Sequence, residues 1–256
     1  MEALSVIFTH LPKDEMLKHY EYHKQKLSNV RVVWDIKDIP PDKFEDPKDP
    51  NIRPMELDNL WSNIHRYFTY CMQWFAQEKC EYFILMERDV VILTKDFERK
   101  IIDFMRDYKV AACFPWIDSK WTNPTHPFNN FLGGIVAKQW TIPALTVMNV
   151  EAMKYYGQSF VHLPDYWGEI RLPSVLAEGG FHITANPYVT GKYFYSPPKG
   201  PEYTPIMQSV SKDLIKEASS RGFRAIHPVK DYSLLDFIRT EINEEEAMKK
   251  NPLTKE

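Results

Sequence analysis

The tripeptide Glu87-Arg88-Asp89 is the strongest candidate for chemistry in this sequence of 256 residues. It follows the apolar run Tyr82–Met86 directly, and a second apolar run begins at Val90. Because alternate residues of an extended chain point to the same side, Glu87 and Asp89 can aim at one point. Two adjacent carboxylates are costly to bury unless a hard divalent cation holds them, and such a cation also binds diphosphates. The tripeptide therefore predicts a metal site; a hairpin turn with solvated charges is the alternative.

The elements around this tripeptide predict an α/β fold. The run Tyr82–Met86 does not alternate between apolar and polar residues, which is typical of a strand buried on both faces. The chain opens with an apolar run at 5–8, a helical pattern that includes Met16, and a second strand at 30–34. Such a β-α-β opening favours a parallel sheet. Ligands of open α/β sheets bind beyond the carboxyl ends of the strands, which is where the tripeptide lies.

Periodicity and turn residues predict the remaining elements. We expect helices over about 56–77, 96–108, 143–157 and 211–220, a short helix that Pro173 opens, and a last helix from about 233. Further strands are expected over 110–114, 131–137 and 181–185, with loops over 38–54, 115–130 and 195–205. This gives one domain over residues 1–240, followed by a charged C-terminal tail, 241–256, which is expected to be solvated or frayed.

Composition excludes several classes of function. The chain has 32 Lys and Arg against 35 Asp and Glu, and a nearly neutral protein is not built to coat nucleic acid or an anionic membrane. No apolar stretch approaches the roughly 18 residues of a membrane span. The nine glycines argue against a Gly-rich phosphate loop. Three cysteines without C-x-x-C spacing predict neither a disulfide framework nor a zinc site, and they fit a reducing, cytoplasmic location.

The order of four short segments resembles the GT-A family of nucleotide-sugar glycosyltransferases. Glu87-Arg88-Asp89 looks like a variant of the family's Asp-X-Asp motif, with Glu in place of the first Asp. The other similar segments are Asn129–Gly134, Gly168–Ser174 and Ile226–Lys230. The resemblance spans residues 5 to about 230. It implies a single GT-A (Rossmann-like) domain with a mostly parallel central sheet flanked by helices.

The resemblance also implies an activity and roles for named residues. A Mn²⁺ or Mg²⁺ ion would be held by Glu87 and Asp89, with His227 completing its coordination. The donor would be a nucleoside-diphosphate sugar, most commonly of UDP, and the acceptor a hydroxyl group of a glycan or glycoconjugate. Glu169 would be the general base that gives inversion, with Asp165 in reserve.

Further residues would bind the donor. Thr9 and Asp35 follow the first two strands, where the family holds the base and ribose, and Gly133 and Gly134 would lie beside the sugar. The implied donor-binding residues are Thr9, Asp35, Arg53, Arg66, Glu87, Arg88, Asp89, Gly133, Gly134 and Lys230. Several of the named residues have a structural alternative. Arg53, Arg66 and Lys230 can be surface charges, and Gly133 and Gly134 can belong to an ordinary strand start. His227 can be an ordinary buried histidine, and Glu169 an acid that suits a helix N-terminus.

Two other functions fit parts of the sequence. A sugar nucleotidyltransferase shares the β-α-β opening and the metal carboxylates, but usually has a Gly-rich loop after the first strand. Here that loop is Thr9-His10-Leu11-Pro12-Lys13, without glycine. A non-catalytic carbohydrate-binding module would use the aromatic residues of two loops, Trp116, Trp121, Tyr166 and Trp167. Such a module should ignore both nucleotide and Mn²⁺.

Overall fold

The structure is a computed structural model of the chain. It describes residues 2–56, 71, 74–115, 117–118, 140–141, 144–159, 168–190 and 210–253. For residues 118, 140, 141, 159 and 168–170 it describes the backbone alone.

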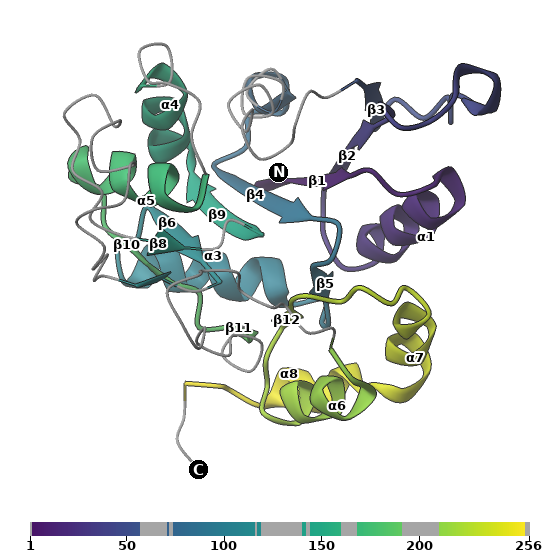
Figure 1. The fold of residues 1–256 in the computed structure, drawn as a ribbon. Helices are drawn as coiled ribbons and strands as arrows, with labels where there is room; N and C mark the ends of the chain where they lie inside the picture. Colours follow the sequence, from purple (N-terminus) through teal and green to yellow (C-terminus); the bar gives the residue numbers. More distant parts are fainter. Residues whose placement is uncertain are drawn as a thin grey trace, which may run out of the picture.

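A seven-stranded sheet forms the centre of the described part of the chain, in the order β10-β6-β9-β4-β1-β2-β3 (Figure 1). All of its neighbouring strands pair in parallel except β9, which is antiparallel to both β4 and β6. The predicted fold class, an α/β protein with a mostly parallel sheet flanked by helices, is confirmed. Its strands are β1 (Ala3–Thr9), β2 (Val30–Asp35), β3 (Ile52–Met55), β4 (Tyr82–Glu87), β6 (Ala112–Phe114), β9 (Leu145–Asn149) and β10 (Ile183–Ala185).

Helices cover both faces of this sheet, so its central strands β1, β4 and β9 are almost entirely buried. Ala3 and Ile7 of β1 face one apolar cluster, whereas Leu4, Val6 and Phe8 face the other, as the two-residue repeat of a strand requires. The first cluster is closed by α1 (Lys13–Lys24) and α3 (Phe97–Asp107), and the second by α4 (Val150–Ser159), α5 (Gly168–Glu178) and residues 74–75 of a helical segment.

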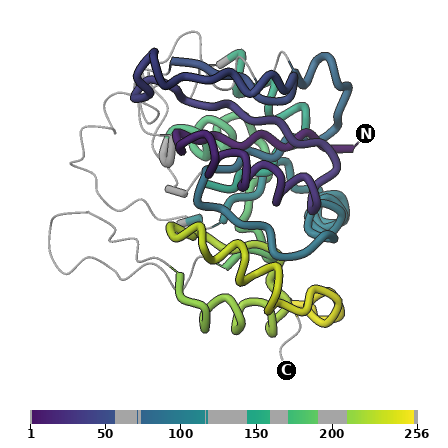
Figure 2. Tube along the Cα trace, turned by 90° about the vertical axis from the view of Figure 1, so that its right-hand side faces the viewer, coloured from purple at the N-terminus to yellow at the C-terminus, as the bar shows by residue number. Residues whose placement is uncertain are grey.

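A third apolar cluster lies beside the main sheet. The small sheet β11-β12-β5 consists of β11 (Val189–Thr190), β12 (Ala225–Ile226) and β5 (Val91–Ile92). The helices α6 (Lys212–Ser220) and α7 (Leu234–Glu241) pack their apolar residues against β5 and β12, and α8 (Glu244–Lys249) lies next to α6 (Figures 1 and 2). The remaining described elements are the 3₁₀ helix η1 (Pro41–Lys43) and the pair β7 (Ile117–Asp118) and β8 (Trp140–Thr141).

The structure corrects three predicted elements. The expected loop 38–54 contains most of β3, an edge strand, where Pro54 is tolerated because one side of the strand needs no ladder hydrogen bond. The expected helix 143–157 is strand β9 followed directly by α4. Pro173 does not open a helix but lies inside α5, which begins at Gly168. Most of the helix expected over 56–77, and the strand expected over 131–137, lie outside the described residues.

The C-terminal segment also differs from its prediction. Instead of fraying, residues 244–249 form α8, which Asn243 caps by accepting the backbone N–H of Glu246 at 3.2 Å. Ala247 is buried, and the Glu244 carboxylate pairs with Lys26. These residues are therefore not frayed, although half of the six are exposed. The proposed domain boundary at residue 240 stays a prediction.

Candidate metal centre

The acidic tripeptide lies where the direction of the chain across the sheet reverses. From β1 the chain adds β2 and β3 on one side, and then returns to place β4 on the other side of β1. The carboxyl ends of β1 and β4 therefore flank a topological switch point, the usual ligand site of an open α/β sheet. Glu87 is the last residue of β4, beside Phe8 of β1 in the parallel register. The backbone then turns, with the Val90 N–H donating to the Glu87 carbonyl at 3.1 Å, and Asp89 lies within this turn.

The small sheet brings His227 to the same turn. The strands β5 and β12 pair antiparallel, with Ile226 opposite Val91, so the residues after β12 run back alongside Asp89. The Val229 N–H donates to the Asp89 carbonyl at 2.7 Å and fixes this register beyond the strand. His227 is thus held opposite the acidic tripeptide by backbone pairing.

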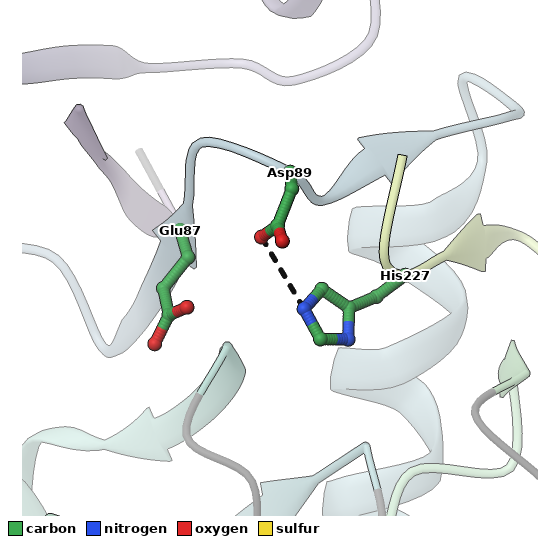
Figure 3. A group of neighbouring side chains, drawn as sticks. All are labelled: Glu87, Asp89 and His227. Atoms are coloured by element: carbon green, nitrogen blue, oxygen red, sulfur yellow. Dashed lines mark ion pairs between the residues drawn. The ribbon is translucent and has the colours of Figure 1, made fainter. Parts of the chain in front are cut away.

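The three side chains converge. Glu87, Asp89 and His227 each offer a ligand atom, and these atoms all lie within 4.8 Å of one another (Figure 3). The His227 ring faces the Asp89 carboxylate, with Nε2 3.2 Å from Oδ1, and only 1% of the His227 side chain is exposed. Glu87 is half-buried. The sequence-based grouping of these residues is confirmed as a group that could hold a metal ion.

Several polar atoms of the cluster are buried without a partner in the part of the chain that the structure describes. Among the described residues, both His227 ring nitrogens and Asp89 Oδ1 are buried without a hydrogen-bond partner. Buried polar atoms are nearly always bonded, because an unsatisfied one costs about 1–3 kcal/mol. The 3.2 Å contact itself lacks the alignment of a hydrogen bond. A cation that accepts the lone pairs of Asp89 Oδ1 and of one His227 ring nitrogen would satisfy two of these three atoms, so the residues fit a divalent metal.

Charges near the turn keep Asp89 ionised. Burial acts to raise the pKa of its carboxyl group, but the contact with His227 and the positive charge of Arg88 outweigh burial, so the pKa lies below its ordinary value. The half-buried Tyr232 is affected by the same groups. Burial, opposed by Arg88 and reinforced by Asp89, raises the Tyr232 pKa to about 12, so its hydroxyl stays protonated at neutral pH.

Thr9 and Asp35 end β1 and β2 at this same edge of the sheet, as predicted. The Thr9 hydroxyl is buried and accepts the Leu11 N–H at 3.1 Å, so it stabilises the turn after β1. Asp35 accepts the Lys37 N–H at 3.0 Å. Both side chains therefore have local structural roles, and their binding of a base or ribose stays a prediction.

Two of the three predicted cationic residues that the structure describes lie at the acidic turn. Arg88 is half-buried between the two carboxylates of the motif. Lys230 is exposed just after the Val229–Asp89 contact. Arg53 is exposed on the edge strand β3. Their role toward a diphosphate stays a prediction.

The roles of the other predicted residues stay predictions. Arg66, Gly133, Gly134 and Asp165 lie outside the described residues. The Glu169 backbone belongs to the first turn of α5 and not to a loop before it. Pro173, four residues later, has no N–H to donate to the Glu169 carbonyl.

Sequence reasoning missed two residues beside the centre. His10 follows β1 directly, and its pKa is lowered by partial burial and then by Arg88, against the opposing effect of nearby acids that include Asp89. Tyr232 reaches the site from the loop before α7. The rule that carboxyl ends of parallel strands share one edge would have found His10. No sequence pattern would have indicated that Tyr232 lies near the site, because it follows no strand of the main sheet.

Among the comparisons with known proteins, only the comparison with solved structures finds matches, and these show similarity of fold alone. No family model and no curated protein matches the chain. A solved glycosyltransferase involved in glycosylation of the major capsid of PBCV-1 is similar at a TM-score of 0.47 and 13% identity, over 93% of this chain and 98% of that one. A CMP:2-keto-3-deoxy-manno-octonic acid synthetase complexed with CTP is similar at 0.42 and 13%, over 73% of this chain and 89% of that one. Because both TM-scores lie below 0.5, the function proposed next rests on the site geometry of this chain.

Among the residues that the structure describes, no helix combines the length and the apolar character that a membrane span needs.

Proposed function

We propose that this protein is a metal-dependent glycosyltransferase that moves a sugar from a nucleoside-diphosphate sugar, with UDP as nucleotide, to a hydroxyl group of a glycan or glycoconjugate. One observation carries the proposal: Glu87, Asp89 and His227 converge at the switch point of a mostly parallel sheet. This is where such folds bind nucleotides, and the convergence of two carboxylates with an imidazole provides a cation site for the diphosphate.

The residues of the chain would divide the work as follows. Asp89, His227 and Glu87 would hold the cation. A bound divalent cation supplies positive charge that stabilises the departing diphosphate. The mixed set of two carboxylates and one imidazole favours Mn²⁺ over Mg²⁺, because imidazole suits transition metals. Glu169, from the first turn of α5, would accept the proton of the acceptor hydroxyl, with Asp165 in reserve, and the sugar would transfer with inversion.

A thermal-shift panel tests this proposal. The panel contains UDP-sugars and other nucleotide sugars, each with Mn²⁺ and with a chelator. Ligand at about 100 times its Kd stabilises the folded state by about 2.7 kcal/mol, which should raise the Tm by about 5 °C or more. We expect this shift with a nucleoside-diphosphate sugar only when Mn²⁺ is present.

Two further arms separate the alternatives. A sugar nucleotidyltransferase should respond to UTP or CTP together with a sugar phosphate more strongly than to any nucleotide sugar. A carbohydrate-binding module should respond to oligosaccharides and to no nucleotide. Either pattern would contradict the proposed activity.

A further inference from the structure

Arg224 is a buried charge that leads into the metal centre. It lies directly before β12 and three residues before His227, and only 1% of it is exposed. Arginine cannot lose its proton in a protein, so a buried guanidinium needs partners for its five N–H groups. Its location predicts that those partners also fix the chain entering the site.

Most of the partners are backbone carbonyls at the end of α8. The guanidinium donates to the carbonyls of Ala247 at 2.9 Å, Met248 at 3.1 Å and Lys250 at 2.9 Å, and also to that of Gly222. A helix end leaves such carbonyls without partners, so Arg224 and α8 satisfy each other. On the other side, Nε of Arg224 is paired with Asp96 at 2.9 Å.

The segment that binds Arg224, residues 243–250, is called here the C-terminal clasp. Its other end is also tied to the body of the protein. The Glu244 carboxylate pairs with Lys26, which follows α1, and accepts the backbone N–H of Lys95, which follows β5. The clasp therefore joins the chain after α1, the chain after β5 and the chain before β12.

The backbone transmits this anchorage to His227. The Arg224 N–H donates to the Tyr188 carbonyl at 2.8 Å, and the Arg224 carbonyl accepts the Leu93 N–H at 2.7 Å. Beyond His227, the Val229 N–H binds Asp89. His227 lies between these fixed points and, among the described residues, its own ring has no hydrogen-bond partner.

This arrangement differs from that of most metal-binding histidines. Such a histidine usually donates its second ring N–H to a carboxylate or carbonyl, which fixes the orientation of the ring. No described residue accepts from the His227 ring, so its orientation depends on the backbone between Arg224 and Val229 and on the packing around the buried ring.

We propose that Arg224, held by the C-terminal clasp, is a positioning residue for His227, so that residues 243–250 set the metal affinity of a site they do not touch. This inference rests on the metal site of the proposed function. It assigns to the C-terminal segment a role in the site and not only in stability.

The test uses Arg224→Lys in the full-length chain, titrated with Mn²⁺ alone by calorimetry. Lysine keeps the charge beside Asp96, but its compact ammonium lacks the planar fork that reaches the carbonyls of α8. Loss of a group that orients a ligand typically weakens metal binding about 10–100-fold, so we expect Mn²⁺ to bind at least about tenfold more weakly. In a His227→Ala background the same change should weaken binding less than about threefold, because the ligand that Arg224 positions is gone.

Two more variants complete the experiment. Ala247→Pro breaks α8 while Arg224 stays in place, and it should weaken Mn²⁺ binding as Arg224→Lys does. Arg31→Lys is the matched control, since Arg31 is also largely buried and donates to Asn29 at 2.7 Å and to Glu78, near the start of β2. It should leave Mn²⁺ affinity unchanged. Urea unfolding confirms that every variant is folded under the titration conditions.

The outcomes separate this inference from the proposed function. Equal weakening by Arg224→Lys in both backgrounds would show a general structural role and overturn the inference. So would wild-type affinity in both Arg224→Lys and Ala247→Pro. If His227→Ala alone binds Mn²⁺ as tightly as the wild type, the metal site itself is wrong.

Discussion

At the residue scale, Asp89 joins the two halves of the site. Its carbonyl accepts the Val229 N–H at 2.7 Å, and its carboxylate lies 3.2 Å from the His227 ring. The backbone contact does not depend on the side chain, whereas the metal-binding role does. A substitution that removes only the charge therefore separates folding from metal binding.

Glu169→Gln should separate binding from chemistry. The amide keeps the size of the side chain but cannot accept the acceptor proton, and general-base catalysis typically contributes about 10²–10⁴-fold in rate. We expect turnover at saturating donor to fall by about that factor, with donor and Mn²⁺ affinities unchanged.

Glu178→Gln, at the exposed end of the same helix, is the control and should turn over normally. If Glu169→Gln keeps its turnover, Asp165→Asn is the next variant. Normal turnover in both would rule out the inverting general-base mechanism and favour a retaining one.

At the element scale, α1 holds β5 in place beside the metal centre. The Tyr22 hydroxyl donates to the Ile92 carbonyl at 2.7 Å, and the Ile92 N–H donates to Nε2 of His23 at 3.4 Å. His23 Nδ1 lies 2.8 Å from the His19 carbonyl and therefore carries the ring proton. Both nitrogens of the neutral His23 ring are thus hydrogen-bonded. Protonation of Nε2 would remove the acceptor of the Ile92 N–H and so break the contact with β5.

This contact predicts a loss of stability in acid. Burial lowers the pKa of His23 from the ordinary 6.5 to about 4, against the hydrogen bond to His19 and with help from Lys26. The unfolded chain therefore binds the proton first, and stability falls as the pH drops from 6.5 towards 4. Between about pH 7 and about pH 5, His23 should account for a loss of about 2 kcal/mol in the free energy of unfolding.

Urea unfolding at the two pH values measures this loss. His23→Gln should be less stable at neutral pH, but it should lose about 2 kcal/mol less than the wild type on acidification. His182→Gln, which changes an exposed histidine, should behave as the wild type does. An unchanged acid loss in His23→Gln would show that His23 is not the group responsible.

Strands and helices whose apolar residues follow one clear pattern could be predicted from the sequence. A strand that runs directly into a helix could not. The strand before Glu87 and the β-α-β opening follow from continuous apolar runs, and both were predicted. Strand β9 runs into α4 without an intervening glycine or proline, so the apolar residues of both elements gave one helical pattern. The two-residue strands β5 and β12 are too short for any pattern, although their pairing brings His227 to Asp89.

At the scale of the whole molecule, the sequence indicated which side chains form the candidate site better than it indicated which contacts fix their positions. Glu87 and Asp89 were found because two carboxylates end an apolar strand, and His227 was grouped with them through the family resemblance. The C-terminal clasp was missed because Arg224 binds backbone carbonyls. Every residue has a backbone carbonyl, so the amino-acid types at 247, 248 and 250 do not indicate this contact. The charged residues of the tail suggested solvation, whereas Glu244 is paired with Lys26.

The central claim is that Asp89 holds a divalent cation that binds the donor diphosphate, and calorimetry of UDP with Mn²⁺ tests it most directly. Wild type should bind UDP with Mn²⁺ and lose that binding on chelation. Asp89→Asn should unfold cooperatively yet show no metal-dependent binding, because it lacks the charge of a hard-cation ligand. Asp103→Asn, at a half-exposed position on α3, should bind as the wild type does. Metal-dependent UDP affinity that is unchanged in Asp89→Asn would contradict the account.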